Sequence, residues 1–160
     1  MPYIISMDTW FNSGGGLPYG ACYGNEIAWA QAAAVQNTWY DISDADMVSG
    51  GLHNVAHDGS GQLSVTYAGF YYCTWYISAE IDAVNKHVQV TFSVNGTETN
   101  DSMNHFESVG ASKQQTMSGV AILDLAAADT LNVSIRITDA GTPDLAVDHL
   151  GFAIIQVGGT

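Results

Sequence analysis

Two segments of the chain alternate apolar and polar residues with the two-residue period of a β-strand. In residues 87–94 the apolar positions are Val88, Val90, Phe92 and Val94. In residues 131–138 they are Leu131, Val133, Ile135 and Ile137. The first segment is followed by Asn95-Gly96, a strong signal for a two-residue hairpin turn. We therefore expect two strands, each with one face in a core and the other exposed to water.

Two other segments carry apolar residues on both faces of the strand that each predicts. Residues 69–82 alternate between a face with Tyr71, Cys73, Trp75, Ile77 and Ile81 and a face with Phe70, Tyr72, Thr74 and Tyr76. Residues 145–157 place Leu150, Phe152 and Ile154 on one face and Val147, Ala153, Ile155 and Val157 on the other. One face of a sandwich sheet normally meets water, so a second apolar face needs another cover. We expect a neighbouring subunit to supply it, with an interface at Tyr72, Tyr76, Phe152 and Ile154.

The first part of the chain differs from the rest. Residues 1–26 combine aromatic residues with turn formers such as Ser13-Gly14-Gly15-Gly16, so we expect an N-terminal arm there and one domain over residues 27–160. The arm's apolar side chains are candidates for anchoring a partner, and an arm that packs on its own domain is the alternative. The anchoring candidates are Tyr3, Ile5, Trp10 and Phe11. Residues 26–36 are alanine-rich and have helix propensity, but their all-β surroundings favour a strand.

The composition narrows the class of partner. The chain has 160 residues, of which 47% are hydrophobic and 12% charged, as in one globular domain. Its net charge is −13, because only Lys86, Lys113 and Arg136 oppose sixteen carboxylates. No basic patch is available for phosphates or anionic lipids, so neither nucleic acid nor a membrane is an expected partner. The sequence has no secretory signal and no apolar run of about 18–20 residues, so we expect a soluble chain that is not exported by a signal of its own.

The sequence contains no recognisable catalytic or cofactor motif. His53 and His57 would lie about 13 Å apart on a strand, too far for one metal ion. The other histidines fit no metal-binding spacing, and neither a phosphate loop nor a Gly-x-Ser-x-Gly elbow occurs. We therefore expect no enzyme activity, no metal and no cofactor.

Three residue groups leave an alternative open. Asp41, Asp44 and Asp46 resemble half of a calcium loop without its glycine and terminal glutamate, and we prefer a solvated acidic turn to a calcium site. Cys22 and Cys73 could pair, but free buried thiols are our expectation. The four tryptophans could stack on sugars, although packing is the commoner role of large aromatic residues.

From about residue 52 the chain resembles the C1q/TNF-like family in the order of its motifs. The matching segments are Leu52-His53-Asn54-Val55, Asp58-Gly59-Ser60-Gly61, Leu63-Ser64-Val65, Tyr67-Ala68-Gly69-Phe70-Tyr71, the strand and turn at 90–96, residues 118–125 with 128–131, and residues 150–157. This resemblance implies an all-β, antiparallel jelly-roll β-sandwich that assembles into a compact homotrimer around a three-fold axis. It leaves function open, because one fold hosts many functions.

These features suggest a trimeric virion structural protein, either a capsid decoration (cement) protein or a fibre-tip protein. Its partners would be capsid or other virion proteins. The alternative is a C1q-like recognition module that binds glycan or protein ligands at a cell surface or in the extracellular space.

Overall fold

Twelve strands form the fold of residues 16–159, the part of the chain that this computed structural model describes. Their bounds are β1 Tyr19–Gln31, β2 Tyr40–Asp41, β3 Val48–His53, β4 Val55–His57, β5 Leu63–Val65, β6 Gly69–Ile81, β7 His87–Val94, β8 Thr97–Glu98, β9 Asn104–Glu107, β10 Gln115–Leu125, β11 Thr130–Ile137 and β12 Leu145–Gly158. Within this range no residue is helical, and so no helix there is long and apolar enough to cross a membrane.

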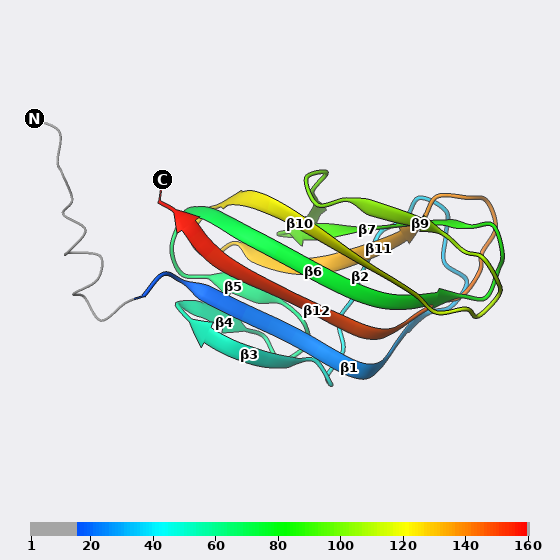
Figure 1. The fold of residues 1–160 in the computed structure, drawn as a ribbon, viewed down its shortest axis with the longest axis horizontal. Coiled ribbons are helices and arrows are strands. Elements are labelled where there is room, and N and C mark those ends of the chain that lie inside the picture. The colour runs from blue at the N-terminus through cyan, green and yellow to red at the C-terminus, as the bar shows by residue number, and fades with distance from the viewer. Residues whose placement is uncertain (1–15, 160) are drawn as a thin grey trace, which may run out of the picture.

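The strands form two antiparallel sheets that pack face to face (Figure 1). Sheet A has the order β10-β6-β12-β1-β3, and its three central strands are 13 or 14 residues long. Sheet B has the order β4-β5-β11-β7-β8, with β2 beside β11 and β9 beside β7. This architecture is the all-β jelly-roll sandwich that the sequence predicts.

The core lies between the two sheets and consists of their inward-facing apolar side chains. On β6 these are the odd-numbered residues from Tyr71 to Ile81, all of which are buried. Phe152 of β12 meets Phe92 of β7 edge to face, with ring centroids 6.0 Å apart and planes at 73°. This contact ties sheet A to sheet B.

The strand predictions from alternation are confirmed, but their exposure is not as expected. The segments at 87–94 and 131–138 form β7 and β11, and the hairpin turn has positive φ at Asn95 (52°) and Gly96 (74°). Both strands were expected to expose their polar face to water. Instead Thr91, Ser93 and Ser134 are completely buried.

Flanking segments of the same chain close this polar face of sheet B. The Thr91 hydroxyl donates to the carbonyl of Thr99, and the Ser134 hydroxyl donates to the carboxylate of Asp41. The Ser102 hydroxyl accepts the backbone N–H of Phe92 at 2.9 Å. Because the hydroxyls of Thr91, Ser102 and Ser134 are bonded internally, their burial costs little, whereas the buried Ser93 hydroxyl has no partner among the described residues.

The expected boundary of the arm at residue 26 is too late. β1 begins at Tyr19, which pairs with Ile155 of β12, so residues 19–26 belong to the sandwich. The alanine-rich segment is a strand only as far as Gln31 and then turns, with positive φ at Ala33 and Asn37.

Candidate functional site

The outer face of sheet A is the most apolar exposed surface of the described residues. Eleven of the sixteen large apolar side chains exposed in residues 16–159 belong to strands of this sheet. They are Tyr19, Tyr23, Val48, Leu52, Phe70, Tyr72, Tyr76, Val120, Ile122, Ile155 and Val157. A contiguous exposed apolar surface usually marks a site of interaction.

Antiparallel pairing arranges the outward side chains in rows across the strands, because residues directly opposite each other share a face. The apolar row consists of Ile122, Tyr72, Ile155 and Tyr19, in the order β10, β6, β12, β1. The middle row consists of Val120, Thr74, Ala153 and Ala21. The glycine row consists of Ser118, Tyr76, Gly151 and Tyr23.

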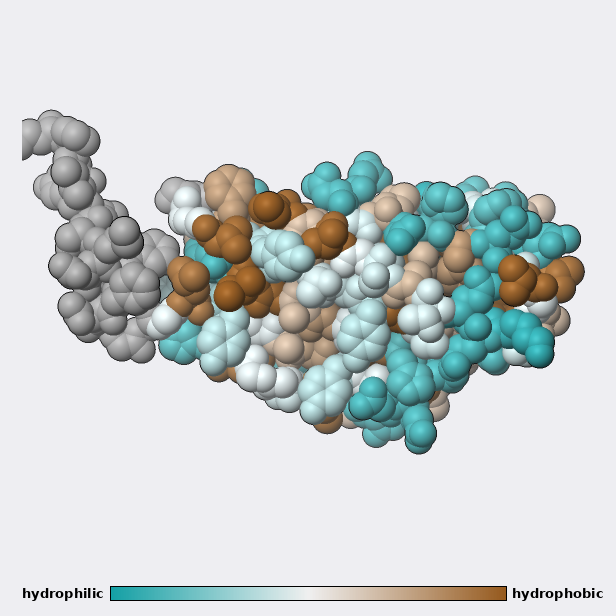
Figure 2. Space-filling model, viewed as in Figure 1, coloured by the Kyte–Doolittle hydropathy of each residue, from teal (hydrophilic) through white to brown (hydrophobic). Residues whose placement is uncertain are grey.

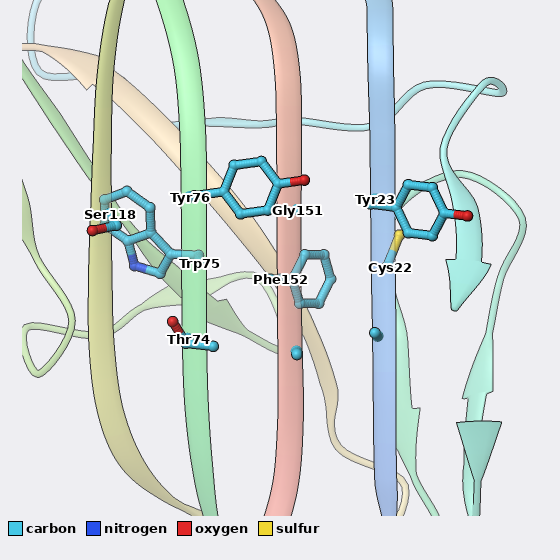
Figure 3. Close-up of a pocket in the computed structure, with 10 residues that line it drawn as sticks. Cys22, Tyr23, Thr74, Trp75, Tyr76, Ser118, Gly151 and Phe152 are labelled. Carbon is cyan, nitrogen blue, oxygen red and sulfur yellow. The ribbon is translucent and has the colours of Figure 1, made fainter. Parts of the chain in front are cut away.

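Glycine allows one tyrosine ring to lie flat on the sheet. A Cβ atom placed on Gly151 would lie 2.4–2.6 Å from the ring and hydroxyl atoms of Tyr76. Figure 3 shows Tyr76 reaching from β6 across Gly151 of β12. Tyr19 stacks on His53, with ring centroids 5.8 Å apart. The aromatic rings therefore line the face instead of projecting from it.

Between these rings the middle row forms a shallow hollow of about 290 Å³. The small side chains of Ala21, Ala153 and Thr74 line it together with Gly151, and Tyr76 and Tyr23 border it (Figure 3). The hollow offers apolar contact area and few hydrogen-bonding groups.

The face changes character along the strands. The row beyond Tyr76 is polar and consists of Thr116, Ser78, His149 and Asn25. Figure 2 shows this change, with hydrophobic atoms gathered toward the start of β1 and hydrophilic atoms toward the opposite end. The exposed apolar surface therefore covers one half of the sheet.

The structure separates the four residues expected at a subunit interface. Tyr72 and Tyr76 lie on the outer face, 44% and 45% exposed. The placement of Phe152 and Ile154 is wrong, because both point between the sheets and are only 3% and 2% exposed. A bulge between Val147 and His149 shifts the alternation of β12 and hides this facing in the sequence. The expected anchoring residues Tyr3, Ile5, Trp10 and Phe11 lie outside the described residues.

Sequence reasoning missed part of the face. Val120 and Ile122 of β10 are among its most exposed side chains, at 51% and 61%. Their alternation with buried Ala121 and Leu123 was the available signal. Gly151 and Ala153 carry no comparable signal, because their importance depends on the neighbouring strands.

Cys22 and His57 lie close together without forming a nucleophilic pair. The Cys22 Sγ is 3.1 Å from His57 Nε2, and the backbone N–H of Gly59 donates to His57 Nδ1. Because Nδ1 accepts this bond, Nε2 is the nitrogen left to donate to the Cys22 sulfur. Burial, and secondarily the nearby charge of Asp58, raises the pKa of the Cys22 thiol to about 12. Burial also raises the pKa of Cys73 to about 12, and both thiols are free. These cysteines act as apolar core residues.

The acidic turn uses its carboxylates for local hydrogen bonds. Asp44 accepts the N–H of Asp46, and Asp41 accepts the Ser134 hydroxyl. Across residues 16–159 no group of three or more histidine, cysteine, aspartate or glutamate side chains is arranged to hold a metal ion. The calcium alternative therefore gains no support from these contacts.

Comparison with known proteins gives structural matches alone. No family model matches the chain, and no curated protein matches it. The chain is similar in structure to Eiger TNF from S. frugiperda, with a TM-score of 0.59 and 12% identity over 89% of this chain and 95% of that one. It is also similar to the globular domain of zebrafish complement 1qA, with a TM-score of 0.58 and 16% identity over 91% of this chain and all of that one.

The two sheets and their order define an antiparallel jelly-roll module with one uncovered apolar face. Its structural neighbours make the fold a C1q/TNF-like jelly roll.

Proposed function

We propose that this chain is a non-enzymatic structural module that assembles into a homotrimer through the outer face of sheet A. The observation that carries the proposal is the concentration of exposed apolar side chains on that face. The apolar, middle and glycine rows contain no charged residue, although the whole chain carries −13 and the exposed Asp124 stands in the adjacent row, opposite Phe70. Copies of so acidic a chain repel one another everywhere else, so an uncharged surface is where they can meet.

As a trimer, the module would decorate a virion as a capsid cement protein or a fibre tip. Three copies present three partner-binding segments, and the resulting avidity can stabilise a particle without a tight single contact. The proposed anchors are Tyr3, Ile5, Trp10 and Phe11. The scarcity of basic residues supports a protein partner over a nucleic acid.

A recognition module for glycan or protein ligands, at a cell surface or outside the cell, is the second candidate. The chain shares its fold with the globular domain of complement 1qA, and that fold accommodates many functions. Glycan-array binding by the trimer, without binding to capsids, would select this candidate. Binding to capsids built from a major capsid protein encoded beside this chain would select the virion role.

Light scattering after size-exclusion chromatography tests the assembly. We expect the wild-type chain to elute with the mass of three chains. Tyr72→Asp places a charge in the apolar row and should yield monomers, whereas Val84→Asp, on the exposed loop after β6, should leave the trimer intact. A wild-type chain that is monomeric at high concentration would overturn the proposal.

A further inference from the structure

The outer face of sheet B carries the only arginine of the chain, Arg136. It lies on β11 in one row with Gln89 of β7 and His105 of β9, because Arg136 pairs with Gln89 and Gln89 with His105. On the other edge of β11 runs β2, which Trp39 directly precedes. Arg136, Gln89 and Trp39 are half-buried and His105 is exposed. Solvent therefore reaches this row, unlike the completely buried hydroxyls in the next row of the same face.

Two contacts hold the guanidinium group of Arg136 in place. Its Nε and Nη2 atoms both donate to Oε1 of Gln89, at 2.8 and 2.6 Å. Its Cζ atom lies 4.3 Å from the ring centroid of Trp39, within the range of a cation–π contact. An arginine that is already fixed in this way loses little further side-chain freedom when it binds a ligand.

These contacts leave one end of the guanidinium without a protein partner. Gln89 occupies the side formed by Nε and Nη2, and Nη1 has no acceptor among residues 16–159. Arg136 also has no carboxylate partner in this range, where every ion pair involves a histidine. The chain has sixteen carboxylates for three lysine and arginine side chains, so acids are not scarce. The donors of Nη1 and the second N–H of Nη2 therefore remain available to an acceptor from outside the chain.

A carboxylate fits this open end. Two N–H groups of a guanidinium match the two oxygens of a planar carboxylate, and such paired bonds are among the strong ones. The net charge of −13 repels polyanions, so a ligand with a single negative charge meets the least repulsion. The side-chain N–H₂ group of Gln89 and the ring of His105 lie in the same row and are suited to hydroxyl groups. A sugar that carries a carboxylate combines both kinds of group.

We infer that Arg136 binds the carboxylate of an acidic sugar, such as a uronic acid, at the outer face of sheet B. Gln89 and Trp39 position the guanidinium, and Gln89 and His105 contact the sugar hydroxyls. This site goes beyond the proposed homotrimer and does not depend on it. The assembly surface lies on the outer face of sheet A, which points away from sheet B on the other side of the sandwich.

NMR titration of the full wild-type chain tests the site directly. Because the chain has a single arginine, its Nε–H group gives one signal that reports on Arg136 alone. The probe is the methyl glycoside of glucuronic acid, and the methyl ester of the same compound is the uncharged control. We expect the acid to shift the arginine signal until it saturates, and the ester to leave the signal in place.

Two charge-matched variants separate the site from the overall charge. Arg136→Gln should weaken binding by about tenfold or more, as expected for loss of hydrogen bonds to a charged group. Lys113→Gln removes the same charge from an exposed loop between β9 and β10, and it should bind like the wild type. Arg136→Lys keeps the charge but loses the planar fork, so it should resemble Arg136→Gln. Ligand-observed NMR measures these affinities, because the Arg136 variants lack the arginine signal.

Gln89→Leu tests positioning without changing the charge. It removes the acceptor of Nε–H, so the arginine signal should move in the free chain and binding of the glucuronide should weaken. An unchanged signal and affinity would overturn the role of Gln89. Circular dichroism with thermal melting checks that every variant folds, and if an Arg136 variant does not fold, the wild-type titration with acid and ester decides.

A saturable shift with the acid alone, together with weaker binding in Arg136→Gln and normal binding in Lys113→Gln, supports the site. The absence of a shift, an equal shift with the ester, or an equal loss of affinity in Lys113→Gln overturns it. Acetate that binds as tightly as the glucuronide overturns the assignment of a sugar ligand. Light scattering measures the homotrimer separately, so failure of this site and failure of the proposed assembly are distinguishable.

Discussion

In both sheets the solvent exposure of the outer face is the opposite of what the polarity of its residues suggests. The outer face of sheet A carries tyrosine, isoleucine and valine, yet in a single chain it remains exposed. The outward side chains of β7 and β11 in sheet B are mostly polar, yet Thr91, Ser93, Asn132 and Ser134 are buried. Segments of the same chain thus cover the polar face of sheet B, whereas the apolar face of sheet A stays exposed.

The difference follows from what each face needs. Buried polar side chains require bonding partners at fixed positions, which segments of the same chain provide for Thr91 and Ser134 through Thr99, Ser102 and Asp41. An apolar face requires only excluded water and a complementary shape, which another copy can provide. We therefore expect changes in sheet B and the core to act on folding, and changes on the outer face of sheet A to act on assembly.

The largest expected contrast is between Phe152 and Tyr72. Phe152→Ala removes a ring that packs on Phe92 and should lower the free energy of unfolding by about 3–5 kcal/mol. Tyr72→Ala should leave the folding of the monomer nearly unchanged and weaken association. Urea denaturation at several chain concentrations separates the two effects, because only association depends on concentration. A concentration-dependent defect in Phe152→Ala would contradict its placement in the core.

Phe152 also shows which features of the fold the sequence predicts and which it does not. Alternation located β7 and β11, and apolar residues on both faces located β6 and β12 and pointed to Tyr72 and Tyr76, whereas most of β1 was assigned to the arm. The same reasoning failed for Phe152, because the bulge at 147–149 reverses which residues of β12 face inward. A bulge is set by the neighbouring strands, and local polarity does not encode it.

The prediction that the polar face of sheet B is exposed to water was wrong for a related reason. Polarity at Thr91 and Ser134 indicates a preference for hydrogen bonds, and water or the chain itself can satisfy it equally. The partners, Thr99 and Asp41, become visible only when segments distant in sequence are placed side by side. The hollow at Ala21 and Ala153 depends in the same way on strand pairing.

Two glycines of sheet A provide a second, smaller contrast. At Gly119 an added Cβ would lie 2.4 Å from the buried indole of Trp75, and at Gly151 it would lie 2.4 Å from the surface ring of Tyr76. Gly119→Ala should therefore cost about 2–3 kcal/mol of folding stability, because the core cannot yield. Gly151→Ala should cost less than about 1 kcal/mol, since the tyrosine can swing outward. Equal losses of stability in thermal unfolding would contradict this distinction.

Substitutions of two serines, one at the outer face of each sheet, allow the two faces to be compared directly. Ser102→Ala removes the acceptor for the buried N–H of Phe92 and the partner of the Thr91 hydroxyl, so we expect a loss of about 1–2 kcal/mol. Ser118→Ala, on the exposed outer face of sheet A, should change stability by less than about 0.5 kcal/mol. Denaturant unfolding measures both, and a neutral Ser102→Ala would argue against internal closure of sheet B.

The smallest expected effect concerns Asp58, in the turn between β4 and β5 of sheet B. Its carboxylate accepts N–H groups of Ser60, Gly61 and Gln62 and the Ser60 hydroxyl. Burial by itself raises the pKa of Asp58, but the hydrogen bonds from Ser60 and Gln62 outweigh it, and the pKa lies below its usual value of 3.8.

A carboxyl whose pKa is lowered by folding contributes stability above the unfolded pKa, and that stability is lost as the pH falls through the folded pKa. Asp58→Asn should therefore reduce stability at neutral pH, by less than about 1 kcal/mol because the side chain is 39% exposed. The difference from wild type should remain constant from neutral pH to about pH 5 and shrink below pH 3.8, as the wild-type carboxyl becomes protonated. A difference that persists undiminished below the folded pKa would mean that the substitution acts through the shape of the turn and not through its charge.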